Sequence, residues 1–85
     1  MTYRVDLARS AEREFHALSA DMRRRVAAAL LRLAEQPISR SARKLSHGRG
    51  WRLRVGDYRV LFVTDDEARV VTVYAIGHRR EVYRS

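Results

Sequence analysis

Residues 51–64 have the sequence WRLRVGDYRVLFVT, which contains the clearest structural pattern in the chain. Apolar and polar side chains alternate on either side of Gly56 and Asp57, with the period of two residues that a half-buried β-strand requires. A Gly-X pair between two such runs is typical of a two-residue hairpin turn. Pairing Val55 with Tyr58 in this hairpin places Arg54 opposite Arg59, on one face of the predicted sheet.

The apolar run at residues 70–76 predicts a third strand of the same sheet. A short turn after the second strand places Tyr74 opposite Arg59, so Arg54, Arg59 and Tyr74 are expected to form one row across the sheet. The same register gives the sheet an apolar face, which consists of Trp51, Leu53, Val55, Tyr58, Val60, Phe62, Val71, Val73 and Ala75.

The N-terminal part of the chain predicts one strand and two helices. Residues 3–7 alternate as a half-buried strand does. Ser10 is the expected N-cap of a first helix over residues 11–18, and Ser19 with Asp21 is expected to cap the second. Apolar residues recur along the second helix at steps of three and four, at Met22, Val26, Ala29, Leu30 and Leu33.

The predicted fold is α+β, with an N-terminal strand, an antiparallel helical hairpin and a three-stranded antiparallel meander. The four strands form one sheet, and both helices pack on one of its faces. A chain of 85 residues with 46% hydrophobic content builds one core, so residues 1–85 are expected to be a single domain. Residues 36–50 are expected to form a basic loop that contains Lys44 and His47.

Composition excludes several classes of site. The chain has no cysteine, and its three histidines lack metal-ligand spacing, so neither a disulfide, a metal site nor a cofactor is expected. Charged residues interrupt every apolar stretch before the roughly 18 residues that a membrane span needs, and the first residues do not resemble a signal peptide. We therefore expect a cytoplasmic protein.

The charge balance points to a polyanionic partner. Eighteen basic and ten acidic residues give a net charge of +8, which attracts nucleic acid. Lys44 is the only lysine, and the guanidinium of arginine suits bidentate contact with phosphate. Codon bias is an alternative explanation for arginine over lysine, though not for the net charge. Arg54 and Arg59 repel each other across the predicted hairpin, which favours a bound phosphate over simple exposure to solvent.

Three segments together resemble the RelE/ParE superfamily of bacterial and archaeal toxins. They are residues 51–62, the strand at residues 70–76 and the ending GHRREVY at residues 77–83, which have the order and spacing of the RelE signature. The N-terminal helical hairpin also fits, so the resemblance covers essentially the whole chain. It implies the RelE-like microbial ribonuclease fold and the toxin of a type II toxin-antitoxin system.

The resemblance also implies an activity, that of a metal-independent mRNA interferase on the ribosome. In this reaction a ribose 2′-hydroxyl attacks the adjacent phosphate, so a proton leaves the 2′-oxygen, charge builds on phosphorus and the 5′-oxygen is protonated. By similarity, Arg52, Arg54 and Arg59 are the cations that stabilise the phosphorus centre. Tyr83 matches the family's general base, and Arg79 matches the arginine near the leaving oxygen.

Several of these assignments have alternatives. Tyrosine and arginine ordinarily titrate near 10 and above 12, so Tyr83 needs nearby cations to act as a base. His78, with an ordinary pKa near 6.5, is an alternative acid or base. The segment before Tyr83 is shorter than in the best-known pattern, which leaves both Arg79 and Arg80 open as the acid. Tyr83 itself has a structural alternative, packing of the tail against the sheet.

Further basic residues are candidates for contact with RNA, and solvated surface charge is the alternative for each. They are Lys44, His47, Arg80, Arg23 and Arg24. The resemblance implies three partners, namely a cognate antitoxin, the ribosome and mRNA, with a toxin-antitoxin heterotetramer as a possible assembly. Two other functions stay open: ParE-like inhibition of DNA gyrase without nuclease activity, and RNA binding without catalysis.

Overall fold

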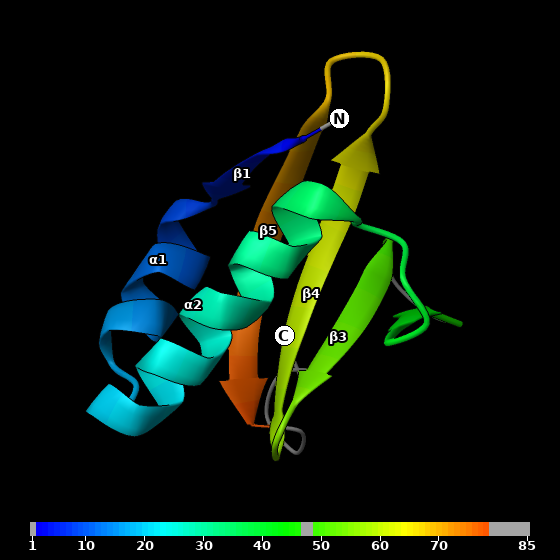
Figure 1. Cartoon of the computed structure of the whole chain (residues 1–85). Helices are drawn as coiled ribbons and strands as arrows, with labels where there is room; N and C mark the ends of the chain where they lie inside the picture. Colours follow the sequence, from blue (N-terminus) through cyan, green and yellow to red (C-terminus); the bar gives the residue numbers. More distant parts are fainter. Residues whose placement is uncertain (1, 47–48, 79–85) are drawn as a thin grey trace.

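The computed structural model describes residues 2–46 and 49–78, which form two layers (Figure 1). Two antiparallel helices lie on one face of a five-stranded sheet with the strand order β1-β5-β4-β3-β2, in which β1 is parallel to β5 and the other pairs are antiparallel. The elements are β1 (Arg4–Leu7), α1 (Arg9–His16), α2 (Ala20–Glu35), β2 (Ala42–Lys44), β3 (Trp51–Val55), β4 (Tyr58–Asp65) and β5 (Val70–His78). The predicted α+β class, with both helices on one face, is confirmed.

The sheet has one strand more than predicted, because β2 lies inside the segment expected to be a loop. Ala42 of β2 pairs with Leu53, and Lys44 pairs with Trp51. A strand of three residues is too short for alternation to identify it, and pairing with β3 supplies the missing information. Lys44 is therefore a strand residue rather than a loop residue, whereas His47 lies outside the described residues.

The helices differ from prediction mainly at their first turns. α1 starts two residues earlier than expected, and its N-cap is Ala8, which makes no side-chain cap. Ser10, the predicted cap, instead donates its hydroxyl hydrogen bond to the carbonyl of Tyr74 at 3.2 Å. Ser19 is confirmed as the N-cap of α2, because its hydroxyl accepts a hydrogen bond from the backbone N–H of Met22 at 3.2 Å.

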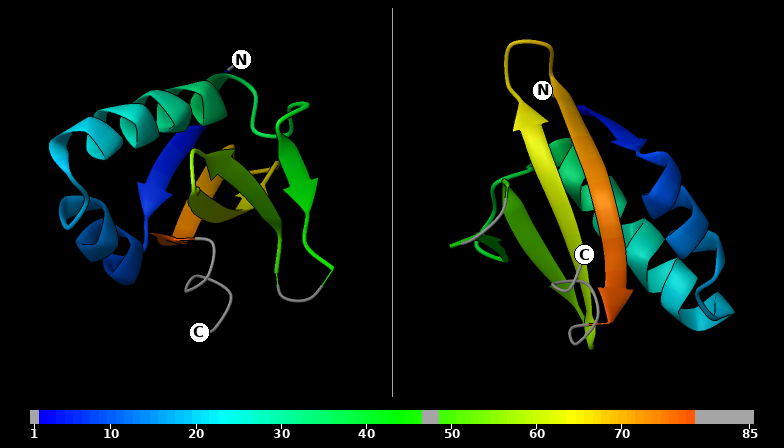
Figure 2. Two further views of the ribbon diagram at one scale, coloured as in Figure 1. Left: turned by 90° about the horizontal axis from the view of Figure 1, so that it is seen from below. Right: turned by 180° about the vertical axis from the view of Figure 1, so that it is seen from behind.

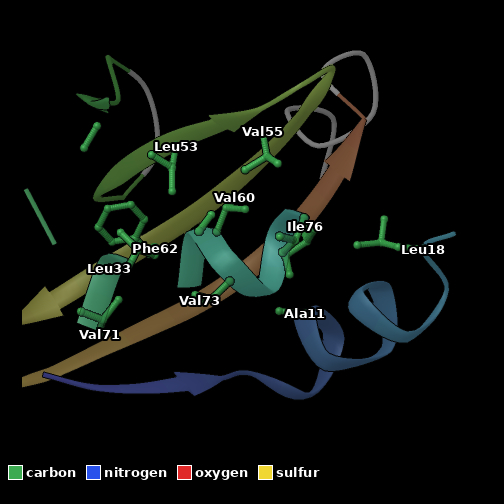
Figure 3. Packing of buried hydrophobic residues seen from close by; sticks show 13 residues of the cluster. Ala11, Leu18, Leu33, Leu53, Val55, Val60, Phe62, Val71, Val73 and Ile76 are labelled. Atoms are coloured by element: carbon green, nitrogen blue, oxygen red, sulfur yellow. The ribbon is translucent and has the colours of Figure 1, made fainter. Parts of the chain in front are cut away.

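The hydrophobic core lies between the helices and the sheet (Figure 3). Phe62 and Val60, at the middle of β4, are completely buried, and Leu33 of α2 packs beside Phe62. Each large side chain that is fully buried in this way stabilises the fold by about 1.5–3 kcal/mol. The core is formed by Ala11, Leu18, Val26, Ala29, Leu33, Ala42, Leu53, Val55, Val60, Phe62, Val71, Val73 and Ile76. Trp51 and Tyr58 are partly buried against it, as predicted.

The β3–β4 hairpin has the predicted register. Val55 pairs with Tyr58 and Arg54 pairs with Arg59. Gly56 has a φ of +60°, a left-handed conformation that glycine adopts without strain. The sequence therefore determines which side of β3 and β4 carries the arginines, because a turn this short permits no slip.

The register between β4 and β5 differs from prediction for two reasons. The turn lies one residue later than expected, so that Asp65 pairs with Val70 and β5 is displaced by two residues, and β5 also contains a β-bulge. Phe62 pairs with Val73 but the preceding residue, Leu61, pairs with Ala75, so Tyr74 is the extra residue of β5 at this point. The predicted row of Arg54, Arg59 and Tyr74 is therefore wrong. The bulge also moves Ala75 to the arginine side of the sheet, opposite to the prediction.

Beyond the bulge, the shifted register brings new residues to each face. Gly77, rather than Tyr74, pairs with Arg59. Ile76 takes the core position expected for Ala75 and is 1% exposed. An extra residue is invisible to an alternation pattern in this segment, because nearly every residue from Val70 to Ile76 is apolar.

Helix α1 supplies two hydrogen bonds to β5 next to the bulge. The carboxylate of Glu14 accepts a hydrogen bond from the backbone N–H of Ile76 at 2.8 Å, in a partly buried position. The Ser10 hydroxyl donates to the carbonyl of Tyr74 in the same stretch. Strand β1 pairs with β5 only as far as Val73, and backbone polar groups beyond that point need other partners, so these two side chains fasten α1 to β5.

Strand β1 is fastened to the far end of the sheet by Tyr3. The Tyr3 hydroxyl donates to Asp66, in the β4–β5 turn, at 2.9 Å, and the Arg69 guanidinium lies over its ring, 5.6 Å from the centroid. The hydrogen bond to Asp66 raises the pKa of Tyr3 above its ordinary value. The phenol is therefore protonated, and able to donate, throughout the neutral pH range.

The Glu14 interaction predicts a specific loss of stability. Replacing Glu14 by alanine leaves the Ile76 N–H without its acceptor, which should lower the free energy of unfolding by about 1–3 kcal/mol and the Tm by at least roughly 4 °C for a domain of this size. Glu14→Gln keeps an acceptor oxygen and should retain most of the stability. Thermal unfolding followed by circular dichroism measures both.

Glu67→Ala, in the exposed β4–β5 turn, is the control for the loss of one negative charge. It should change the free energy of unfolding by less than about 0.5 kcal/mol. Equal Tm values for Glu14→Ala and Glu67→Ala would show that the Glu14 hydrogen bond does not stabilise the fold.

Candidate functional site

Arginines gather on the sheet face that lies away from the helices. Arg43 of β2 pairs with Arg52 of β3, and Arg54 pairs with Arg59 of β4. Their neighbours in sequence, Ala42, Leu53, Val55 and Val60, face the core, so alternation turns all four arginines to the other side. None of the described helices covers this side, as Figure 2 shows in the view from behind. We call Arg43, Arg52, Arg54 and Arg59 the arginine face.

The arginine face is compact because its members form two adjacent rows. Directly paired residues of antiparallel strands have Cβ atoms about 4.5–5.5 Å apart, and the rows are two residues apart along β3, or roughly 7 Å. Four guanidinium groups are thus held within reach of one short stretch of a polyanion. Like charges this close raise the free energy of the isolated fold.

Arg59 is the residue of this face with the most unusual environment. It is only 6% exposed, and it is the one charged residue that is buried in the described part of the chain. One of its terminal nitrogens donates to the Tyr58 carbonyl at 3.3 Å, and its Nε has no hydrogen-bond partner. Burying a cation without an anionic partner is unfavourable. The site therefore holds a desolvated positive charge, whose attraction for an anion is weakly screened.

Gly77 opens the neighbourhood of Arg59 on the β5 side. Because it pairs directly with Arg59 and has no side chain, β5 contributes only backbone at that position. Glycine inside a strand often marks a place where a ligand or another backbone approaches closely. The bulge at Tyr74 creates this pairing, because Ile76 would stand opposite Arg59 if the register of Phe62 with Val73 continued along β5.

Tyr74 has a different role from the one predicted. Its hydroxyl donates a hydrogen bond of 2.6 Å to the carbonyl of Arg49, just before β3. Because β4 lies between β5 and β3, this bond spans β4 and ties the two flanking strands together. Gly50 lets the backbone before β3 lie close to β4, because a Cβ at this position would be only 2.1 Å from the Phe62 carbonyl oxygen.

The other predicted acid-base residues lie elsewhere or outside the described residues. His78 pairs with Tyr58 and its ring contacts the Tyr58 ring edge to face, with centroids 5.7 Å apart. Alternation places this pair on the side of the sheet opposite to Arg59. Arg79, Arg80 and Tyr83 lie outside the described residues, so their roles stay predictions.

The remaining predicted RNA contacts are dispersed. Arg23 donates to the carbonyl of Leu18 at 2.9 Å and more weakly to that of His16 at 3.5 Å, so it caps the end of α1. Arg24 forms an exposed ion pair with Asp21 at 3.5 Å. Both residues lie on α2, away from the arginine face. Lys44 pairs with Trp51, which places it on the other side of β2 from Arg43.

Sequence reasoning missed one member of the arginine face, Arg43, and two residues beside it, Arg40 and Ser41. Arg40, Ser41 and Arg43 line a hollow together with Arg52 and Arg54. Their segment was predicted to be a loop, and only the pairing of β2 with β3 reveals where they lie. The sequence contains one weak signal for this strand, which is the apolar residue Ala42 between two polar neighbours.

Two absences concern the described residues only. Within residues 2–46 and 49–78, no group of three His, Asp or Glu side chains is arranged to hold a metal ion. No helix among them is long and apolar enough to cross a membrane.

Comparison with known families agrees with this geometry. The sequence model of the ParE toxin of type II toxin-antitoxin systems, parDE, matches residues 5–83. The chain belongs to this toxin family. The resemblance to the RelE/ParE superfamily is thereby confirmed. No curated protein sequence matches the toxin at a significant level.

Solved structures similar to the toxin are RelE proteins. The RelBE2 complex of Mycobacterium tuberculosis matches with a TM-score of 0.83 and 27% identity, over 93% of this chain and 100% of that one. The RelE-RelB complex of Pyrococcus horikoshii has a TM-score of 0.81 and 27% identity, over 95% and 99%. The isolated RelE toxin of E. coli has a TM-score of 0.79 and 27% identity, over 95% and 90%. The RelE-like fold of the toxin is confirmed.

The burial of Arg59 predicts that the charge of this residue does not stabilise the fold. Arg59→Met keeps a long side chain but removes the buried charge, so the free energy of unfolding of the toxin should be unchanged or higher, because replacing buried charge by apolar groups is often neutral or stabilising. Chemical denaturation measures it, with Arg54→Met, at an exposed position, as the control.

A fall of more than about 2 kcal/mol for Arg59→Met alone would contradict this prediction. It would mean that the guanidinium contributes stabilising contacts to the fold, and the case for a charge kept for binding an anion would fail.

Proposed function

We propose that the toxin cleaves mRNA on the ribosome, by attack of a ribose 2′-hydroxyl on the adjacent phosphate. The observation that carries this proposal is the buried cation Arg59 beside Arg54 and Arg52, on a sheet face left open by the helices. A rigid strand pair holds these groups, so they need little rearrangement when the phosphate arrives. Preorganised cations of this kind are the largest contributors to stabilising a charged transition state.

The proposed chemistry divides among the predicted residues. Arg52, Arg54 and Arg59 would stabilise the additional negative charge on the pentacoordinate phosphorus, and the burial of Arg59 strengthens that interaction. Tyr83 would accept the 2′-hydroxyl proton, a role that requires cations beside the phenol in the complex with RNA. Arg79 or Arg80 would assist departure of the 5′-oxygen. These roles follow from the resemblance to RelE enzymes.

His78 is the weaker alternative for proton transfer. Its ring contact with Tyr58 places it on the helix side of the sheet, and a catalytic group must lie within hydrogen-bond reach of the proton that it moves. Catalysis by His78 would require β5 to rearrange near its end. We therefore assign the base to Tyr83.

Inhibition of DNA gyrase is the second candidate function, because the family model that matches the chain is that of ParE toxins. Fold alone does not distinguish the two activities. The arginine face favours a phosphate substrate, since a surface that only docks on another protein gains nothing from a buried cation without an anionic partner. Binding of RNA without cleavage is a third candidate.

Each function implies partners. As a type II toxin, the protein is expected to bind a cognate antitoxin, and similar structures are toxin-antitoxin complexes. An antitoxin with acidic residues would complement the net charge of +8. We expect a toxin-antitoxin heterotetramer in the cytoplasm, with the ribosome and mRNA as the targets of free toxin.

The test is cleavage of mRNA on programmed ribosomes by purified toxin. Arg59→Ala should lower the cleavage rate about 100-fold or more, in line with removal of one group that stabilises transition-state charge, and Tyr83→Phe should lower it through loss of the base. Arg4→Gln is the charge-matched control. Arg4 is exposed on β1 and paired with Asp6 at 3.1 Å, so this variant should cut at the wild-type rate.

Other outcomes identify the other functions. Intact mRNA together with inhibition of gyrase in a supercoiling assay would establish the ParE-like activity and overturn the nuclease. Tight RNA binding without cleavage, unaffected by Tyr83→Phe, would indicate a binding module. Cleavage by Arg59→Ala at the wild-type rate would remove Arg59 from the mechanism.

A further inference from the structure

A second cationic feature adjoins the arginine face at the free edge of the sheet. Arg40 and Ser41, which directly precede β2, line a hollow of about 380 Å³ together with three members of the arginine face. The described residues that line it are Arg40, Ser41, Arg43, Arg52 and Arg54. We call this hollow the edge pocket.

The described residues that line the edge pocket all carry hydrogen-bond donors. Four of them are arginines and one is a serine, and none of these five has a carboxylate. The ion pairs within the described residues, Arg4 with Asp6 and Arg24 with Asp21, lie on other elements. Four cations that share a hollow repel one another, and an oxyanion that accepts bidentate hydrogen bonds from two or more of them removes that cost.

The position of the edge pocket relates it to the proposed cleavage site. Arg52 and Arg54 line the pocket and also belong to the arginine face, while Arg59 is on the next strand, β4. Neighbouring strands are about 4.8 Å apart, so the region between β2 and β3 lies roughly 5–10 Å from Arg59 across the sheet. One RNA strand that runs across the sheet would present successive phosphates to both places.

We propose that the edge pocket binds a backbone phosphate one or two nucleotides from the scissile linkage and so holds the mRNA in register. This inference rests on the proposed nuclease function, and it assigns Arg40 and Arg43 as positioning residues. Arg52 and Arg54 would face both phosphates. Ser41, beside them, supplies a neutral donor that fits a phosphate oxygen.

The neighbouring surface suggests what else could occupy this edge. A larger groove of about 880 Å³ follows the C-terminal half of α2 and shares Arg40, Ser41 and Arg54 with the edge pocket. Leu31, which lines the groove, is 72% exposed. An acidic segment of an antitoxin is therefore the competing occupant. The continuity of the pocket with the arginine face, and its polar lining, favour RNA.

The experiment uses a double-mutant cycle between protein and RNA. The mRNA has a 2′-deoxyribose at each position of the cut codon, so that it cannot be cleaved. Each mRNA of a series also carries one uncharged methylphosphonate linkage, at a different position in each member, and is bound to ribosomes. Toxin affinity is measured for the wild type and for Arg40→Gln/Arg43→Gln. Neutralising the linkage in the pocket should weaken binding of the wild type by about 10-fold or more, the loss expected for hydrogen bonds to a charged group.

On unmodified mRNA, the double variant should bind more weakly than the wild type by a similar factor. Neutralising that one linkage should not weaken its binding further. Arg4→Gln/Arg9→Gln removes two charges elsewhere and is the matched control, which should keep the linkage-specific loss. Arg40 and Arg43 are exposed, and removing them relieves repulsion, so the Arg40→Gln/Arg43→Gln variant should unfold at a Tm no lower than that of the wild type, which is checked first.

The outcomes separate this inference from the proposed function. If every modified linkage weakens binding of the double variant as much as binding of the wild type, the proposed role of the edge pocket is wrong, even if the wild type cuts unmodified mRNA. Weaker binding of an acidic antitoxin peptide, with RNA binding unchanged, would also overturn it and assign the pocket to the antitoxin. A single linkage that shows the coupling, in a toxin that never cuts, would support the pocket while the nuclease proposal fails.

Discussion

The backbone N–H of Ile76 donates a hydrogen bond to the Glu14 carboxylate, and this contact fastens helix α1 to β5 at the point where the register of β5 changes. It stands next to the bulge at Tyr74, where β5 has one residue more than β4. Because side chains alternate along a strand, one inserted residue exchanges the faces of every residue that follows. The bulge sends Ile76 into the core and sets Gly77 against Arg59. Helix α1 contacts β5 next to this bulge, although it packs on the side of the sheet opposite to the arginine face.

The arginine face shows a conflict between folding and binding. Paired arginines on neighbouring strands and a buried Arg59 both oppose folding, and the apolar core on the other face offsets them. Local features that disfavour the fold, and that nothing nearby relieves, are expected at functional sites. The arginine face is such a feature, and a bound phosphate would offset the repulsion among its arginines.

Membership of the ParE toxin family, together with structural similarity to RelE proteins, illustrates that a shared fold can support different activities. In this toxin the sheet scaffold, formed by β3, β4 and β5, places side chains rigidly on one open face. Changes at a few positions of that face alter what it binds without changing the core. The activity must therefore be argued from Arg52, Arg54, Arg59 and their surroundings rather than from the scaffold.

The sequence alone determined the local elements. The two-residue turn at Gly56 fixed the pairing of Arg54 with Arg59, and the spacing of apolar residues identified α2 and its cap at Ser19, because these features depend on neighbours in sequence. Only the tertiary structure decided where β5 bulges, that residues 42–44 form a fifth strand, and that Arg40 and Arg43 join the arginine cluster. These features depend on hydrogen bonds and pairing between segments far apart in the chain, such as Glu14 with Ile76, and no local pattern contains that information.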